Sequence, residues 1–458
     1  MKRVLSVLIS VLLLGTFPPA AMADDPTITV MSRNLYLGAD VGVAMELLPD
    51  FPAATQFMWD QMSETDFPTR SKEFVKEIAA SDPDVIGLQE ATNWYCQKNL
   101  IGKDVAIYDF VEILLADLRS AGLEYEVANK DGKVAQNVGF EIKPIAYLTK
   151  ATDPEIFEPL FDQDFAYCGF EIADVLLIKS SLREDLLAVG TSEYKAKYTI
   201  IPTLMTVYRG YSWADINFGG KPVRFVTTHL ESLFDETKVP VAKLQADQLV
   251  TDLSTTKIPV VVMGDFNSDP RDPRGAGQDN PGGQPIENEL CKAQKDLTNM
   301  LQADSTCNAY WTMVDAGFVN VSPESMKPSN FTWGLNASLS GPDEIRGPAA
   351  KEMGNEFGFT DRLDYIFANG EIELVSTELI GNNQTGTQNT KVWASDHAGL
   401  VSTIQIRSSA EYLEEPLSDH SRFPIGFWKA AGILLSLIAF LLGVLGFRIR
   451  RRAGNLAN

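Results

Sequence analysis

The 458-residue sequence predicts an α+β fold in which two β-sheets form a sandwich. Short segments that alternate apolar and polar residues indicate half-buried strands, and segments with one apolar helical face lie between them. Several of these strands end on a polar residue that could take part in chemistry. The three observations together predict one domain with a functional site at its strand ends.

The two ends of the chain have other patterns. Residues 1–23 combine a basic start, an apolar run and small residues, which is typical of a secretory signal peptide. Residues 430–447 form an uncharged, mostly apolar run that would be about 27 Å long as a helix, enough to cross a membrane. The arginines of the 448–458 tail place this tail in the cytoplasm by the positive-inside rule. We therefore expect an exported, single-pass, cell-surface protein whose domain, 24–410, is followed by a juxtamembrane linker, 411–429.

The part of the chain outside the membrane is strongly acidic. Without the seven basic residues of the two ends, 32 basic residues face 61 acidic ones, a formal charge of −29. Such a surface does not attract polyphosphate over long distances. Tight nonspecific binding to nucleic acid is thus disfavoured unless basic charge is concentrated locally or a divalent metal intervenes. A nuclease is not excluded.

The four cysteines are even in number and lie in a chain expected to be exported, so disulfides are expected. Three pairings exist. Cys291 with Cys307 would close a short loop in a polar insertion and leave Cys96 with Cys168, which is the preferred pairing. Zinc is the weaker alternative, because no Cys-x-x-Cys motif or nearby histidine supports it.

The first half of the domain offers two strands with polar ends. Residues 27–34 alternate like a half-buried strand and end on Asn34, after which we expect a looser stretch as far as Pro68. Residues 85–88 form a short apolar strand that presents Glu90 at its end. The other elements expected in this half are helices at 70–80 and 108–120 and a strand at 174–178.

The segment 260–267 has the clearest chemical pattern of the second half. Four apolar residues, three of them β-branched, lead through Gly264 to Asp265 and Asn267. Since side chains two apart on a strand share a face, the carboxylate and the amide should point the same way, where they could position a water and bind a phosphate oxygen. The alternative is a strand that ends in an Asx-type turn.

Further strands flank this segment. Residues 222–230 put His229 on the apolar face after a hairpin turn at 217–220, although a lone histidine there is more often a satisfied core residue. Asp364 lies within an apolar strand, 363–367, where a carboxylate needs a partner such as a histidine. The remaining features are a helix at 239–253, a loop insertion at about 270–360 with a short element at 311–319, and a strand at 399–406 preceded by Asp396 and His397.

These polar residues suit metal-assisted hydrolysis of a phosphoester, because they include oxygen ligands for a divalent ion, a water-orienting carboxylate, neutral donors and imidazoles. As a set they resemble the endonuclease/exonuclease/phosphatase superfamily, which includes deoxyribonuclease I-like nucleases, abasic endonucleases, neutral sphingomyelinases and inositol polyphosphate phosphatases. The motifs of this resemblance, spread over roughly residues 27–406, are Arg33-Asn34, Leu88-Gln89-Glu90, Thr228-His229-Leu230, Gly264-Asp265-Phe266-Asn267, Arg362-Leu363-Asp364-Tyr365 and Ser395-Asp396-His397.

The resemblance implies a four-layer αββα sandwich with the site at one end of the two sheets. It also implies a magnesium site, for which Mn²⁺ could substitute. Glu90 would be the main ligand, with Asn34 and Asp396 close to the metal.

The resemblance assigns catalytic roles to five more residues. Asp265 would orient or deprotonate the attacking water, while Asn267 and His229 would hold phosphate oxygens. His397, oriented by Asp364, would stabilise charge on the phosphoryl group.

Two details bear on the substrate and on the completeness of the site. Asn34-Leu35-Tyr36 looks like the Asn-x-Tyr pattern of bacterial sphingomyelinases and lacks the acidic residue that some abasic endonucleases carry there. Together with the acidic charge and the membrane helix, this favours lipid or small phosphodiesters. Many relatives supply a further Tyr or Glu between Glu90 and His229, and Asp174 is the candidate in this chain.

The expected function is that of an extracytoplasmic, membrane-anchored, divalent-metal-dependent phosphoester hydrolase, a phosphodiesterase in which water attacks phosphorus. The alternatives are a secreted-type DNase, a sphingomyelinase-like phospholipid hydrolase and a catalytically inactive surface-binding module. Loss of a metal ligand or histidine would indicate the inactive module, and none is missing. A phospholipid, a small phosphodiester or a nucleic acid is the expected substrate, and no protein partner is predicted.

Overall fold

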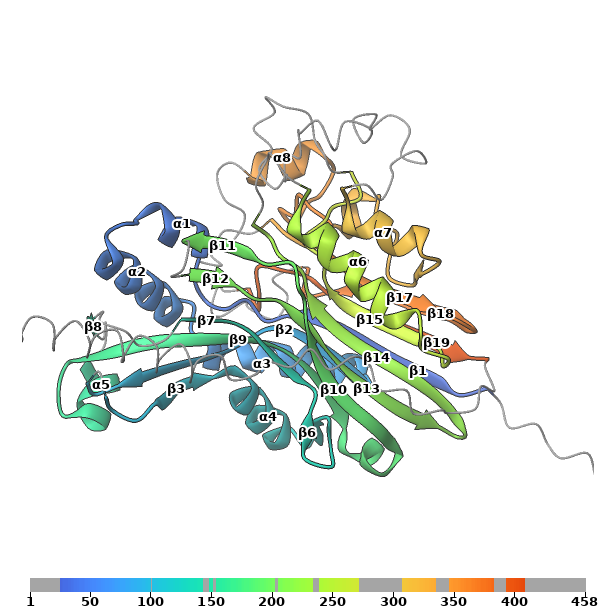
Figure 1. The fold of residues 1–458 in the computed structure, drawn as a ribbon, viewed down its shortest axis with the longest axis horizontal. Coiled ribbons are helices and arrows are strands. Elements are labelled where there is room, and N and C mark those ends of the chain that lie inside the picture. The colour runs from blue at the N-terminus through green and yellow to red at the C-terminus, as the bar shows by residue number, and fades with distance from the viewer. Residues whose placement is uncertain are drawn as a thin grey trace, which may run out of the picture.

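Two large β-sheets lie face to face in the computed structural model, and helices cover the outer face of each (Figure 1). This is the mixed α/β sandwich that the sequence predicts. The structure describes residues 25–99, 101–142, 148–150, 154–201, 205–233, 239–271, 307–334, 346–382 and 393–407.

The first sheet contains both ends of the described chain, because the first strand pairs with the last. Its main path runs in the order β18 (Ile372–Ile380), β19 (Gly399–Ile406), β1 (Thr27–Asn34), β2 (Val85–Gln97), β9 (Phe165–Lys179) and β4 (Tyr125–Val127). Off this path, β3 (Val105–Asp109) pairs with β2, and β7 (Gln136–Ile142) and β8 (Leu148–Lys150) pair with β9. Among these pairs only β1 and β2 run parallel.

The second sheet contains His229, Asp265 and Asp364 of the predicted site. Its order is β10 (Leu186–Glu193), β13 (Gly210–Phe218), β14 (Lys221–His229), β15 (Val260–Asp265), β17 (Asp364–Asn369) and β16 (Val319–Asn320). Two small hairpins pair β5 (Asn129–Lys130) with β6 (Lys133–Val134), and β11 (Tyr198–Ile201) with β12 (Met205–Val207).

The helices divide between the two outer faces. Trp59, Phe74 and Leu114 of α2, α3 and α4 pack on the first sheet, and Leu249 and Met313 of α6 and α7 pack on the second. A third apolar cluster fills the space between the sheets. The helices are α1 (Val41–Glu46), α2 (Phe51–Glu64), α3 (Phe67–Ser81), α4 (Phe110–Ser120), α5 (Pro154–Phe161), α6 (Val241–Leu253), α7 (Ala309–Asp315) and α8 (Arg346–Glu352), with 3-10 turns at Ser180–Asp185 and Pro328–Asn330.

Several predicted boundaries are wrong. The looser stretch expected before Pro68 contains α1 and α2, whose first turns are capped by the carboxylates of Asp40 and Asp50. The strand expected at 85–88 continues to Gln97. The edge strand β18 is absent from the prediction because many of its residues face solvent and give no clear apolar alternation.

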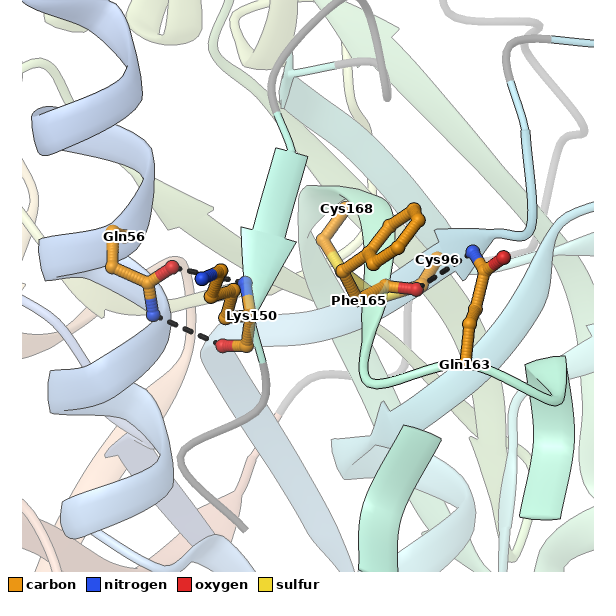
Figure 2. The surroundings of a disulfide bond; sticks show 6 residues. All are labelled: Gln56, Cys96, Lys150, Gln163, Phe165 and Cys168. Carbon is orange, nitrogen blue, oxygen red and sulfur yellow. Dashed lines mark hydrogen bonds between the residues drawn. A yellow bond between two sulfur atoms is a disulfide. The ribbon is translucent and has the colours of Figure 1, made fainter. Parts of the chain in front are cut away.

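The predicted Cys96–Cys168 disulfide is confirmed. It joins two residues that pair directly across β2 and β9, which are long antiparallel neighbours (Figure 2). Nearby, the Gln56 side chain both donates to and accepts from the backbone of Lys150, which ties α2 to β8. Cys291 lies outside the described residues, so the pair expected for it with Cys307 stays a prediction.

Other predictions also fall outside the described residues. These are the signal peptide at 1–23, the linker at 411–429, the transmembrane helix at 430–447 and the tail at 448–458. None of the helices within the described ranges is long and apolar enough to cross a membrane. The domain limits 24–410 and most of the insertion expected at about 270–360 likewise stay predictions.

Candidate active site

Strand alternation brings four polar side chains to one end of the space between the sheets. On β15 and β17, the residues two and four positions away from the strand end belong to the apolar cluster between the sheets, and on β1 and β14 the residue four positions away does. The next inward position on each strand is polar: Asn34, His229, Asp265 or Asp364. Asp265 is the register partner of both His229 and Asp364, so three of these residues lie side by side in the second sheet.

The Asp265 carboxylate is the centre of this group. Its Oδ2 accepts a hydrogen bond from Asn34 Nδ2 at 3.1 Å, across from the first sheet. The same oxygen lies 3.5 Å from His229 Nε2 and 3.6 Å from His397 Nε2. Burial raises the pKa of Asp265 to about 7, helped by the nearby Asp364 and opposed by His397.

His397 and Asp364 form the pair that the sequence predicts. His397 Nδ1 lies 2.8 Å from Asp364 Oδ2, and both side chains are buried. Arg33 donates to the backbone carbonyl of His397, which fixes the segment before β19. Burial lowers the pKa of His397, but Asp364, Asp396 and Asp265 outweigh it and raise this pKa to about 10. At neutral pH the ring is therefore a cation with two N–H donors.

Asn267 reaches the site by a turn. Its φ of 45° is left-handed, and its N–H donates to Asp265 Oδ1 at 2.9 Å, so the strand does end in an Asx-type turn. The Asn267 side chain still faces the site, since its Nδ2 lies 3.0 Å from His229 Nε2 and donates to Leu230 O at 2.8 Å. The two interpretations of this segment are thus compatible, although strand alternation is not the reason that the two side chains meet.

Glu90 lies within a strand, which corrects the prediction that it follows one. Ile86 and Leu88 face the helices, so regular alternation would turn Glu90 away from the site. The β2–β9 register shifts between Leu88 and Ala91, and Glu90 has a left-handed φ of 53°. Such a bulge re-aims a side chain. Glu90 Oε2 then accepts from Leu37 N at 2.6 Å.

The predicted metal ligands offer suitable oxygens. Burial raises the pKa of Glu90, and the neighbouring Asp396 raises it further. Asp396 Oδ2 accepts from Trp333 Nε1 at 3.2 Å, and Asn34 Oδ1 accepts from Tyr36 N at 2.8 Å. Two carboxylates and an amide oxygen are the hard ligand set that Mg²⁺ prefers. The chemistry of the donors therefore fits a divalent cation.

A second cluster of possible ligands is less suitable for a metal. Among the described residues, Asp265, Asp364 and His397 offer ligand atoms within 4.8 Å of one another. However, the Asp364 carboxylate already pairs with His397 Nδ1, and a protonated imidazole has no lone pair to give to a metal.

Two charged residues at this end, Arg209 and Glu231, have no role assigned from the sequence, whereas Asp174 is the candidate predicted for the further site residue. Arg209 Nη1 lies 2.9 Å from His229 Nδ1, and Arg209 Nε lies 3.7 Å from the buried Glu231 Oε2. Asp174 on β9 faces the bulge and is buried, which raises its pKa well above the usual range. Glu231 closely follows the end of β14 and could have been found by the rule that strand ends carry polar site residues, whereas Arg209 lies outside any periodic pattern.

One family model matches part of the chain. The model of the endonuclease/exonuclease/phosphatase family matches residues 196–397, the part of the chain that includes His229, Asp265, Asp364 and His397. No curated protein matches the chain.

Solved structures with low sequence identity align with most of the chain. An endonuclease/exonuclease/phosphatase from Beutenbergia cavernae is 16% identical with a TM-score of 0.44, and the alignment covers 83% of this chain and 72% of that one. A family protein from Leptotrichia buccalis is 15% identical with a TM-score of 0.42, covering 83% and 100%. A mannosyl-6-phosphatase from Bacteroides thetaiotaomicron is 13% identical with a TM-score of 0.40, covering 82% and 99%.

Proposed function

We propose that this protein is a divalent-metal-dependent phosphodiesterase, because residues 196–397 match the model of the endonuclease/exonuclease/phosphatase family, whose members hydrolyse phosphoester bonds. The observation that carries the proposal is the position of Asp265. One oxygen of its buried carboxylate lies 3.1 Å from an amide nitrogen and 3.5 and 3.6 Å from two imidazole nitrogens. A carboxylate in that position can orient water, while the donors around it bind phosphoryl oxygens.

Glu90, Asn34 and Asp396 would hold the metal in this proposal. When bound, a divalent ion such as Mg²⁺ polarises a phosphoryl oxygen and offsets developing negative charge. The support is the ligand chemistry: two acidic side chains, each held by a hydrogen bond, and an amide oxygen in a buried site. Mn²⁺ accepts the same oxygen ligands and would substitute.

The remaining residues would act directly on substrate and water. Asp265 orients the attacking water and is positioned to take its proton. Asn267 Nδ2 and His229 Nε2, 3.0 Å apart, would bind phosphoryl oxygens. His397, held by Asp364, presents a positively charged N–H on the other side of Asp265 and would stabilise charge that develops on the phosphoryl group.

A panel of phosphoester substrates tests the proposal. Full-length protein in detergent would be assayed with a choline phospholipid, a chromogenic phosphodiester, a phosphomonoester and plasmid DNA, each with and without magnesium. We expect magnesium-dependent hydrolysis of a diester, lost in Asp265→Asn. Asp247→Asn is the matched control, because that carboxylate is 46% exposed on α6 and remote in sequence from the site. Binding without turnover on every substrate would favour the inactive surface module.

For the substrate, we propose a lipid or another small phosphodiester in preference to DNA. The support is the charge of −29 on the part outside the membrane, which repels DNA. Screening over about 10 Å at 0.1 M salt weakens this repulsion, so any nuclease activity should rise with moderate salt, while hydrolysis of a zwitterionic phospholipid changes far less. Efficient DNA cleavage at low salt that falls as salt is added would indicate a basic groove and contradict this choice.

We also propose that the protein is exported and anchored with its domain outside the cytoplasm. The support is the pattern of the two chain ends together with the Cys96–Cys168 disulfide, because disulfides persist in oxidising compartments. Protease treatment of intact cells tests the proposal. Digestion of the domain while a cytoplasmic control protein survives is the expected result, and full protection would contradict it.

A further inference from the structure

Arg209 lies behind His229, on the side of the ring away from Asp265. Its Nη1 is 2.9 Å from His229 Nδ1, and its Nε is 3.7 Å from Glu231 Oε2. The Arg209 side chain is 11% exposed, and the Glu231 side chain is fully buried. The carboxylate keeps the guanidinium in place, since Glu231 Oε1 is itself fixed by the N–H of Leu233 at 3.0 Å.

The chemistry of this contact determines where His229 carries its proton. Both ring nitrogens face groups that can only donate, the Arg209 guanidinium at 2.9 Å from Nδ1 and Asn267 Nδ2 at 3.0 Å from Nε2, and a neutral ring can accept from only one of them. The guanidinium is charged and makes the shorter contact, which favours Nδ1 as the acceptor. A neutral imidazole has one N–H, and with Nδ1 accepting, that N–H is on Nε2. Burial, and then the positive charges of Arg209 and His397, lower the pKa of His229 well below its usual value, which agrees with a neutral ring.

The Nε2–H points to the place where substrate would bind. Nε2 lies 3.5 Å from Asp265 Oδ2 and 3.0 Å from Asn267 Nδ2. The orientation of the Asn267 amide is set by Leu230 O, which accepts at 2.8 Å and can be satisfied only by a donor. An N–H of His229 and an N–H of Asn267 therefore lie next to each other, an arrangement that suits one anionic oxygen accepting from both.

We propose that Arg209 is a positioning residue that holds His229 in its Nε2-protonated tautomer, so that His229 donates a hydrogen bond to a phosphoryl oxygen and does not accept a proton. The mechanistic part rests on the proposed phosphodiesterase function. A carboxylate behind the ring would have the opposite effect, because it accepts from Nδ1–H, as Asp364 does for His397. Arg209 thus excludes His229 as the general base.

The tautomer can be measured directly by NMR. The chain contains three histidines, so selective ¹⁵N-histidine labelling of the full-length protein in detergent gives three ring spectra, assigned with His397→Gln and His420→Gln. We expect His229 to show an unprotonated Nδ1 and a protonated Nε2. Arg209→Met should shift protonation toward Nδ1, whereas Arg209→Lys, which keeps a donor-only cation, should retain the wild-type tautomer at least in part. Arg183→Met, at a side chain 62% exposed, is the control.

Several outcomes would overturn the proposal. If the wild-type spectrum shows His229 protonated on Nδ1, the proposal is wrong. It is also wrong if His229 keeps the wild-type tautomer in Arg209→Met. If Arg209→Met does not fold because Glu231 is left buried without a partner, Arg209→Met/Glu231→Gln removes both charges and makes the same measurement. In turnover, we expect a loss of about 10²-fold for Arg209→Met with partial recovery in Arg209→Lys. Absence of phosphoester hydrolysis in the wild type would contradict the proposed function. The NMR spectra would still decide whether Arg209 sets the tautomer of His229.

Discussion

The two histidines of the site approach the same oxygen from opposite environments. His229 Nε2 and His397 Nε2 lie 3.5 and 3.6 Å from Asp265 Oδ2. Behind His229, at Nδ1, is the guanidinium of Arg209, and behind His397, also at Nδ1, is the carboxylate of Asp364. The pKa of His229 is lowered well below its usual value, while that of His397 is raised to about 10.

This difference shows that the group behind the ring sets the charge of a buried histidine. Burial favours the neutral form of both rings. For His229 the cation adds to that effect, whereas for His397 the surrounding carboxylates overcome it. One side-chain type can therefore supply a neutral donor and a cationic donor to the two sides of one carboxylate.

Removal of the metal should have the largest effect and should separate the two histidines. Asp396 raises the pKa of His397, and His397 lowers the pKa of Glu90, whereas the pKa of His229 is lowered by burial, Arg209 and His397. We expect exhaustive chelation to abolish turnover and added Mg²⁺ or Mn²⁺ to restore it. In the NMR spectrum, Mg²⁺ should move the His397 signals more than the His229 signals. Full activity after chelation would contradict the metal dependence.

Loss of the carboxylates should have the next largest effect. Asp265→Asn or Glu90→Ala should lower turnover by at least about 10²-fold with the fold retained, because each side chain acts on water or metal and contributes little to apolar packing. Turnover and circular dichroism would be measured beside Asp247→Asn, whose carboxylate is exposed on α6. Near-normal turnover in either variant would disprove the role given to that residue.

Removal of the charge behind His397 tests one side of the comparison alone. Asp364→Asn should lower kcat by about 10²-fold with little change in KM, because the lost stabilisation belongs to charge that develops in the transition state. The tautomer of His229 should not change. Asp315→Asn, at an exposed position of α7, is the control. A rise in KM with unchanged kcat would mean that His397 stabilises the bound substrate as much as the transition state.

A shift of the pH profile is the smallest expected effect. Asp265, with a pKa of about 7, loses its proton as the pH rises, so turnover should increase through that range if the carboxylate is the active form. The charge of His397 lowers this pKa. In His397→Gln this charge is lost, so the residual turnover should begin to increase at a higher pH than in the wild type. His229→Gln removes a neutral ring and should leave the pH of this increase unchanged. Equal shifts of the pH profile in both variants would contradict the difference in charge between the two histidines.

The strand positions of the site could be read from the sequence because alternation is a local property. Asn34, His229, Asp265 and Asp364 each lie an even number of positions from apolar residues of their own strand that face the space between the sheets, and the structure keeps that spacing. Which strands are neighbours is a long-range property. Alternation alone therefore predicts the ends of the strands without predicting that His229 and Asp364 flank Asp265.

The rest of the site depends on departures from regular structure. Glu90 points inward only because of a bulge, and a bulge has no fixed sequence signal for a residue other than glycine. Asn267 depends in the same way on a left-handed turn. Arg209 follows β12 and precedes β13, so no periodicity marks it, and its importance comes from His229 and Glu231 placed by other segments.

The helices before Pro68 illustrate the same limit. The buried residues Ala54, Met58 and Met62 of α2 are four apart, which is a helical spacing. Polar residues between them make the signal weak, and packing against β2 and α5 through Trp59 supplies the stability that local propensity lacks.

The Cys96–Cys168 bond has a consequence for the geometry of catalysis. A slip by one residue between two strands exchanges the faces of every side chain, and β2 and β9 already contain one irregularity at Glu90. The covalent link, six residues beyond Glu90, permits a single alignment of this ribbon. The oxidation state of the surroundings thereby becomes a condition for the position of the Glu90 carboxylate, the proposed metal ligand. In a reducing environment, the same chain would have to keep its alignment by packing and hydrogen bonds alone.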